Sequence, residues 1–126
     1  MSCTALNDKQ EGYKLPKDCI RYDLAAKDRL NLSEMTCTVI YEGAHEQRHQ
    51  LKVVGELLSD DLTEDALIYV TVYDENGTLV GCDFSVAISK SGFWGLMPFS
   101  TAVFVPKDTV LSEVVIRPDA DPSKTR

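Results

Sequence analysis

The chain has 126 residues, of which 44% are hydrophobic and 26% are charged, and its formal net charge is −7 at pH 7. These values are typical of one soluble globular domain that is large enough to bury a hydrophobic core. The acidic charge argues against nucleic acid or an anionic membrane as a partner, because both require basic surfaces. No apolar run approaches the length that spans a bilayer, so no membrane span is predicted.

The N-terminal residues 1–18 predict a polar, weakly ordered lead-in. The first thirty residues lack the apolar core of a signal peptide, so the sequence as written predicts a cytoplasmic protein. If the N terminus had been trimmed, the alternative is an exported protein or a lipoprotein that carries its lipid on Cys3. Residues 19–23 then predict a short edge strand, and residues 24–32 predict one or two helical turns.

Alternating apolar residues predict strands at 35–41 and 51–57. Between them, His45, Glu46 and His49 match the His-Glu-x-x-His motif, in which the histidines bind zinc and the glutamate activates water. Only a helix places residues four apart on one face, and this segment lies between two strands. We therefore favour a solvated hairpin loop without a metal, with a zinc-dependent hydrolase as the alternative.

The clearest strand signal is residues 66–88, where two alternating runs flank a turn sequence. A three-residue loop, 75–77, pairs Asp74 with Thr78 and brings the apolar faces of both strands together. This loop predicts a type I turn that Asp74 caps, with Gly77 in the left-handed conformation as a bulge.

The same loop determines which residues of the hairpin face the core. It places the apolar residues of both strands opposite one another: Val72 with Val80, Val70 with Cys82, and Ile68 with Phe84. Cys82 and Phe84 are therefore expected in the core.

The segment 89–99 combines large apolar residues with glycines and a proline between two strands. One interpretation is a loop that covers the open end of the core. The other is an exposed patch that binds a protein partner, because Trp, Phe and Met are enriched at interface centres. The candidate partner-binding residues are Phe93, Trp94, Leu96 and Met97.

Two last strands are expected at 99–105 and 111–117. With about seven strands, the sequence predicts an all-β fold, an antiparallel β-sandwich of immunoglobulin-like architecture. The expected division of the chain is a lead-in at 1–18, a sandwich domain at 19–118 and a polar tail at 119–126.

The four cysteines, at positions 3, 19, 37 and 82, have no C-x-x-C spacing and therefore predict no zinc ribbon or thioredoxin-type site. Cys37 and Cys82 fall in strand patterns and are expected as small buried residues. A disulfide between these two remains open at this point.

The run formed by residues 53–55, 67–74 and 76–80 resembles the FxLYD-type bacterial sandwich domains. Those domains carry a strand that ends in glycine, a strand that ends in Tyr-Asp, a glycine turn and a later Phe-containing strand, here 99–105. The similarity covers roughly residues 51–118. It implies a β-sandwich that often occurs in exported proteins, and it assigns no activity.

The sequence therefore predicts a non-enzymatic β-sandwich interaction module that binds a protein partner or itself and needs no cofactor. Two alternatives differ in class. One is the zinc-dependent hydrolase that uses His45, Glu46 and His49, and the other is a small subunit of an envelope or toxin-neutralising complex.

Overall fold

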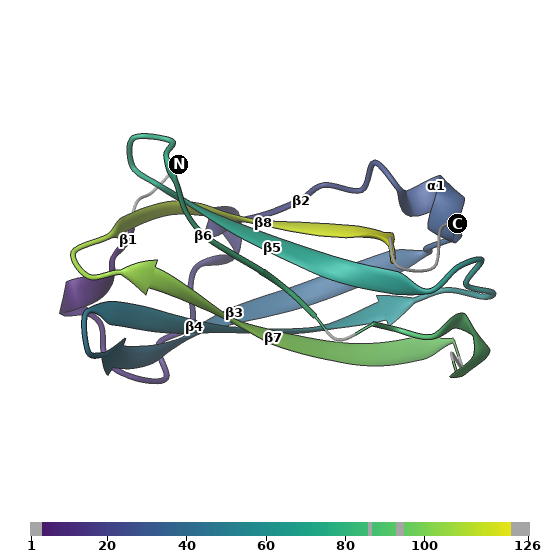
Figure 1. The fold of residues 1–126 in the computed structure, drawn as a ribbon, viewed down its shortest axis with the longest axis horizontal. Coiled ribbons are helices and arrows are strands. Elements are labelled where there is room, and N and C mark those ends of the chain that lie inside the picture. The colour runs from purple at the N-terminus through teal and green to yellow at the C-terminus, as the bar shows by residue number, and fades with distance from the viewer. Residues whose placement is uncertain (1–3, 86, 93–94, 122–126) are drawn as a thin grey trace.

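The computed structural model describes residues 4–85, 87–92 and 95–121. Its strands form two sheets that pack face to face, which confirms the expected all-β sandwich (Figure 1). No helix of the described residues is long and apolar enough to cross a membrane.

The first sheet, the A sheet, has the strand order β1-β8-β5-β6, and β2 pairs in parallel with β8 beside β1. The second, the B sheet, has the order β3-β4-β7 and is antiparallel. The strands are β1 (Thr4–Ala5), β2 (Ile20–Tyr22), β3 (Glu34–His45), β4 (Arg48–Leu58), β5 (Ala66–Asp74), β6 (Leu79–Phe84), β7 (Leu96–Pro106) and β8 (Val110–Ala120). The short helices are η1 (Leu6–Asp8), η2 (Lys17–Cys19), α1 (Lys27–Leu30) and η3 (Lys90–Gly92).

The core lies between the sheets and is built by alternate residues of the long strands. In β4 the buried residues alternate with exposed or half-buried ones, so one face of the B sheet points inward and the other outward. The fully buried side chains of the long strands include Val39, Leu51, Val53, Leu57, Val103 and Val105 from the B sheet and Ala66, Ile68, Val70, Val72, Leu111, Val114 and Ile116 from the A sheet.

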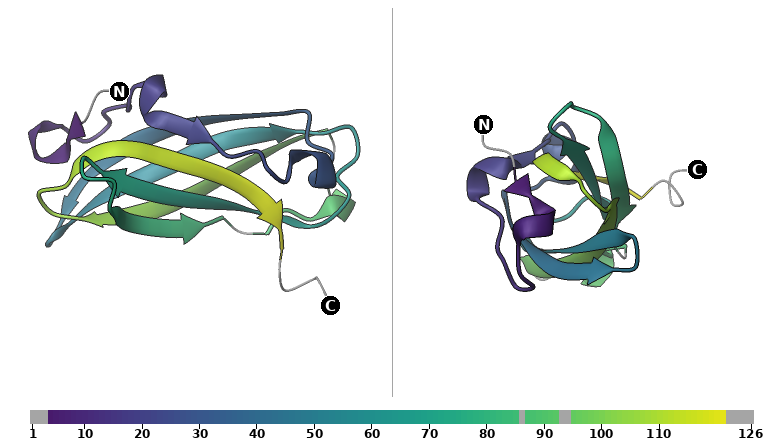
Figure 2. Two further views of the ribbon diagram at one scale, coloured as in Figure 1. Left: turned by 90° about the horizontal axis from the view of Figure 1, so that it is seen from above. Right: turned by 90° about the vertical axis from the view of Figure 1, so that its left-hand side faces the viewer.

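The N-terminal segment packs into this core from Thr4 onward, whereas the sequence suggests a weakly ordered lead-in. Leu6 and Leu15 are both buried. The backbone N–H of Leu15 donates to the carbonyl of Val39 at 2.9 Å, so this segment also lies along the free edge of β3. Figure 2 shows it running along one side of the sandwich. Its two leucines provide the physical reason for the order, because an apolar side chain gains free energy on leaving water.

The turn between β5 and β6 has the structure that the sequence predicts. The N–H of Asp74 donates to the carbonyl of Thr78, and the N–H of Gly77 donates to the carbonyl of Asp74, both at 3.0 Å. Gly77 has a φ of 77°, and the Asp74 carboxylate accepts hydrogen bonds from the N–H groups of Asn76 and Thr78. The three-residue loop with a glycine bulge is therefore confirmed.

The register beyond that turn differs from the prediction. Tyr73 pairs with Leu79 and Val72 pairs with Gly81, so Val80 is an extra residue that forms a second bulge. The bulge turns the rest of β6 over, and the expectation that Cys82 and Phe84 lie in the core is therefore wrong. Cys82 is exposed, and 57% of Phe84 is accessible to solvent.

The backbone of β7 explains why Gly81, not Cys82, faces inward. A Cβ atom at Gly81 would lie 2.7 Å from the carbonyl oxygen of Phe104, so no larger residue fits there without movement. The hydroxyl of Thr101 also donates to the carbonyl of Phe84 at 3.2 Å. These contacts close the sandwich where β6 passes β7.

The free edge of β7 carries two prolines. Pro98 lies opposite Glu56 and Pro106 opposite Arg48. Proline has no N–H, and the backbone nitrogens of these two residues point to the free edge and not to β4. The prolines therefore remove no hydrogen bond between β7 and β4. Prolines on an edge strand hinder the addition of another strand, which makes β7 a poor site for pairing with an extended peptide.

Candidate binding surfaces

The segment from His45 to His49 forms the β3–β4 hairpin and not the helix that the zinc motif needs. His45 pairs with Arg48, and His49 pairs with Ala44. The two histidines therefore point to opposite faces of the hairpin, and they cannot share a metal ion in this arrangement. Within the described residues, no group of three or more His, Cys, Asp or Glu residues could hold a metal.

His49 is not solvated as the sequence suggests, since only 2% of it is exposed. Its Nδ1 lies 2.6 Å from the hydroxyl of Tyr41, and its Nε2 lies 2.7 Å from Oδ1 of Asn7. Asn7 in turn donates through Nδ2 to the carboxylate of Asp108. The imidazole therefore joins the B sheet to η1 and to the β7–β8 turn.

These partners determine the tautomer of His49. The amide nitrogen of Asn7 donates to Asp108, so the amide oxygen faces His49. This oxygen can only accept a hydrogen bond, so Nε2 of His49 carries the proton and donates. Nδ1 is then bare and accepts the hydroxyl proton of Tyr41. Burial lowers the pKa of His49; Asp108 opposes this effect and Lys107 adds to it. The site holds a neutral imidazole as a structural link.

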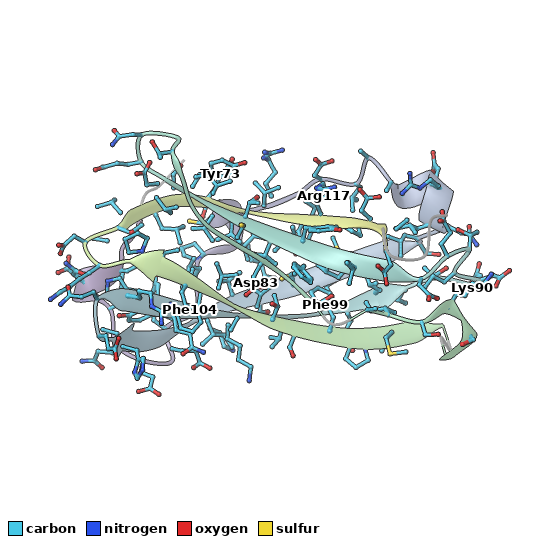
Figure 3. The ribbon with its side chains drawn as sticks, in the orientation of Figure 1. Tyr73, Asp83, Lys90, Phe99, Phe104 and Arg117 are labelled. Atoms are coloured by element: carbon cyan, nitrogen blue, oxygen red, sulfur yellow. The ribbon has the colours of Figure 1, made fainter. Side chains whose placement is uncertain are left out.

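The outer face of the A sheet carries a row of stacked side chains that the sequence did not indicate as a site. Phe84, Tyr69 and Arg117 are neighbours across three strands, because Tyr69 pairs with both of the others. The Tyr69 and Phe84 rings have centroids 6.1 Å apart, and the Arg117 guanidinium lies 4.5 Å from the Tyr69 ring. Figure 3 shows Arg117 on this outer side of the sandwich.

Two ion pairs hold the arginine end of this row. Arg117 Nη1 lies 2.7 Å from one oxygen of Asp119, and Arg29 Nη2 lies 2.5 Å from the other. Arg29 also pairs with Glu64 at 3.5 Å. Exposed ion pairs contribute little to stability, but several together restrict side-chain rotation. We call the row Phe84, Tyr69, Arg117 and Asp119 the aromatic stack.

Of the four residues that the sequence proposes for partner binding, the structure describes Leu96 and Met97, which lie on opposite faces of the B sheet. Leu96 begins β7 with 46% of its surface exposed, opposite Leu58. Met97 is half-buried and packs against the core from the inner face. Phe93 and Trp94 lie outside the described residues.

Leu96 belongs to a different surface, the outer face of the B sheet, which we call the B face. Phe104 stands near its other end with 37% of its surface exposed, and the Arg48 guanidinium lies 4.4 Å from its ring. The outward apolar residues of this face are Ile40, Val54, Leu58, Leu96, Pro98, Ala102 and Phe104.

Cys37 and Cys82 are free thiols in different sheets, so the disulfide left open by the sequence is not formed. Burial raises the pKa of Cys37 to about 12, which keeps this thiol protonated at neutral pH. Cys82 is exposed beside Thr71.

Comparisons of the chain with protein-family models, with curated proteins and with solved structures found no match. The class of protein that the fold defines is an all-β sandwich, and a fold of this class does not by itself imply a function.

Proposed function

We propose that this chain is a non-enzymatic β-sandwich module that binds another protein through the aromatic stack. One observation carries the proposal: Phe84 is 57% exposed, yet its ring is held beside Tyr69, which in turn is held by Arg117. The FxLYD-type resemblance of residues 51–118 agrees with a module of this kind and remains a proposal.

The composition of the stack supports binding. Residues that dominate the free energy of protein interfaces are enriched in Tyr, Trp and Arg, and aromatic rings supply a large contact area with few rotatable bonds. Side chains that are already ordered lose less entropy when a partner docks, so more of the contact energy appears as affinity. The bridging of Arg29 and Arg117 by Asp119 provides such order before binding.

A site-specific photo-crosslinker tests the proposal in the native cell. We expect p-benzoylphenylalanine at position 84 to yield a discrete crosslinked protein. The matched control is position 79, because Leu79 lies on the same strand with 50% of its surface exposed and outside the stack. A crosslink to a different protein at position 96 but not at 84 would transfer the binding site to the surface that contains Leu96.

A second experiment separates binding from stability. Phe84→Ala should lower capture of the crosslinked protein at least tenfold, since a hot-spot truncation costs about 2 kcal/mol or more. The melting temperature should stay within a few degrees of the unsubstituted protein, because Phe84 lies outside the core. Unchanged capture by Phe84→Ala would exclude the stack as the binding surface.

A further inference from the structure

The B face has an internal symmetry in the placement of its side chains. Thr38, Val54 and Ser100 form a row across the middle of β3, β4 and β7. Along β4, Lys52 and Glu56 lie at equal distances on either side of this row.

The apolar residues of β7 follow the same pattern. Leu96 and Phe104 lie at equal distances on either side of Ser100, and both are exposed. The face therefore carries a cation and an anion at matching positions near its middle, and a large apolar side chain at each end.

Neither charge has an ion-pair partner in the part of the chain that the structure describes. Among the described residues, Lys52 and Glu56 form no ion pair, whereas Arg21, Arg29 and Arg117 on the other side of the molecule all do. Lys52 lies between Ile40 and Ala102 in its row. Residues four apart in a strand are about 13 Å apart, too far for Lys52 and Glu56 to pair with each other.

From these positions we infer that the B face binds a second copy of this chain, with the two-fold axis running across the strands through the Val54 row. This rotation places Lys52 of one copy opposite Glu56 of the other, and Phe104 opposite Leu96. Both charge pairs and both apolar contacts form at once, because an interface of this symmetry uses each contact twice.

The shape of the face accommodates these pairs. One hollow beside Val54 is lined by Lys52, Pro98 and Ser100 together with residues 87–89, and another is lined by Lys17, Thr36, Thr38 and Glu56. The lysine of each copy would enter the hollow beside the glutamate of the other, while packed sheets stay about 10 Å apart. The alternative two-fold axis, parallel to the strands, would place Lys52 against Lys52 and is disfavoured by charge.

Charge reversal tests this inference by sedimentation equilibrium at protein concentrations up to about 100 μM, a range that detects micromolar dimers. The unsubstituted chain should form a dimer. Lys52→Glu and Glu56→Lys should each raise the dissociation constant at least tenfold, because like charges then face each other.

The equimolar mixture of these two variants gives the sharpest result. One variant carries only acidic residues at positions 52 and 56 and the other only basic ones, so the mixed dimer has both pairs complementary. Its dissociation constant should lie within about threefold of that of the unsubstituted dimer. The double variant Lys52→Glu/Glu56→Lys should dimerise with a similar dissociation constant.

The control substitution is Lys90→Glu, which makes the same change of charge in η3, at one end of the sandwich and outside the strands of the B sheet (Figure 3). It should dimerise as the unsubstituted chain does and should not restore association when mixed with Glu56→Lys. A chain that is monomeric at the highest concentration, or a dimer that both charge reversals leave intact, would overturn the inference. The partner proposed for the aromatic stack is tested separately, because no substitution used here touches that surface.

Discussion

At the scale of single residues, His49 shows how a polar group can belong to the interior of a sandwich. Its two ring nitrogens both form hydrogen bonds, with Tyr41 and with Asn7, so the ring leaves water without losing hydrogen-bond partners. Protonation would require Nδ1 to donate to a hydroxyl that now donates to it. Burial therefore favours the neutral ring and lowers its pKa.

This lowered pKa predicts a loss of stability in mild acid. In the unfolded chain His49 takes up a proton below its ordinary pKa of 6.5, whereas the folded chain resists protonation, so the free energy of unfolding falls as the pH drops. His49→Gln should be less stable than the unsubstituted protein at pH 7.5, and this difference should narrow toward pH 5.5. Urea unfolding at each pH measures it.

The chain provides its own control for this experiment, because His45 is the only other histidine. His45→Gln changes an exposed side chain of the same hairpin and leaves the Tyr41–His49–Asn7 contacts in place. A difference between unsubstituted and His49→Gln protein that stays constant across the pH range would refute the role assigned to the neutral ring.

The cysteines lead to a second prediction at this scale. Iodoacetamide at pH 8 should modify Cys82 at least tenfold faster than Cys37. Cys82 is exposed, and a thiol with a pKa of about 12 contains almost no reactive thiolate at that pH. Peptide mapping by mass spectrometry measures both rates in one sample. Equal rates would mean that β3 opens readily at Cys37.

At the scale of elements, the β5–β6 hairpin separates what the sequence can predict from what it cannot. The turn was predictable because an aspartate carboxylate accepts hydrogen bonds from turn N–H groups and glycine adopts positive φ, and a three-residue loop places Asp74 and Gly77 where these properties are needed. The register beyond it was not, because Val80 and Cys82 are both apolar and alternation alone cannot detect an inserted residue between them.

The glycine between them was the available signal. Glycine inside a strand often marks a close approach of another backbone, and here that backbone is β7 at Phe104. The approach depends on residues that are distant in sequence, so it could not be predicted from the hairpin alone. Because the predicted register placed Phe84 in the core, the aromatic stack on the surface could not be predicted.

Gly81→Ala tests this explanation. The added methyl group would collide with the Phe104 carbonyl, so the free energy of unfolding should fall by about 1–3 kcal/mol, the usual cost of overpacking. The matched control is Cys82→Ala on the next residue, which faces outward and should change stability by about 0.5 kcal/mol or less. Urea denaturation compares them. Equal effects would show that β7 does not restrict this position.

At the scale of the whole molecule, the sandwich is closed by contacts between segments that are distant in sequence: residues 4–18 pack against β3 and β8, and β6 passes β7. The sequence predicted the all-β class because alternation is a local property of each strand. It did not predict that residues 4–18 complete the core, since that segment has few apolar residues and its partners are β3 and β8. Nor did it predict that Leu96 and Met97, two of the residues proposed for partner binding, lie on opposite faces of the B sheet.

Leu6→Ala measures how much the N-terminal segment contributes. Leu6 is fully buried, so we expect the free energy of unfolding to fall by about 2–5 kcal/mol, as for other large-to-small substitutions in a core. Lys9→Ala changes a half-buried side chain in the same segment, which contacts the Tyr13 ring, and should have a much smaller effect. A small effect of Leu6→Ala would mean that the sandwich folds without this segment.

The parallel pairing of β2 with β8 has a consequence for how the chain is made. β1 and β2 are synthesised before the other strands of the sandwich, yet both of them pair with β8, the last of these strands in the chain. Contacts of such long separation form slowly and only once both segments are present. Leu6, whose N–H donates to the carbonyl of Thr109, therefore stays exposed to solvent while the hairpins β3–β4 and β5–β6 are synthesised. During this period β1 and β2 are accessible to chaperones.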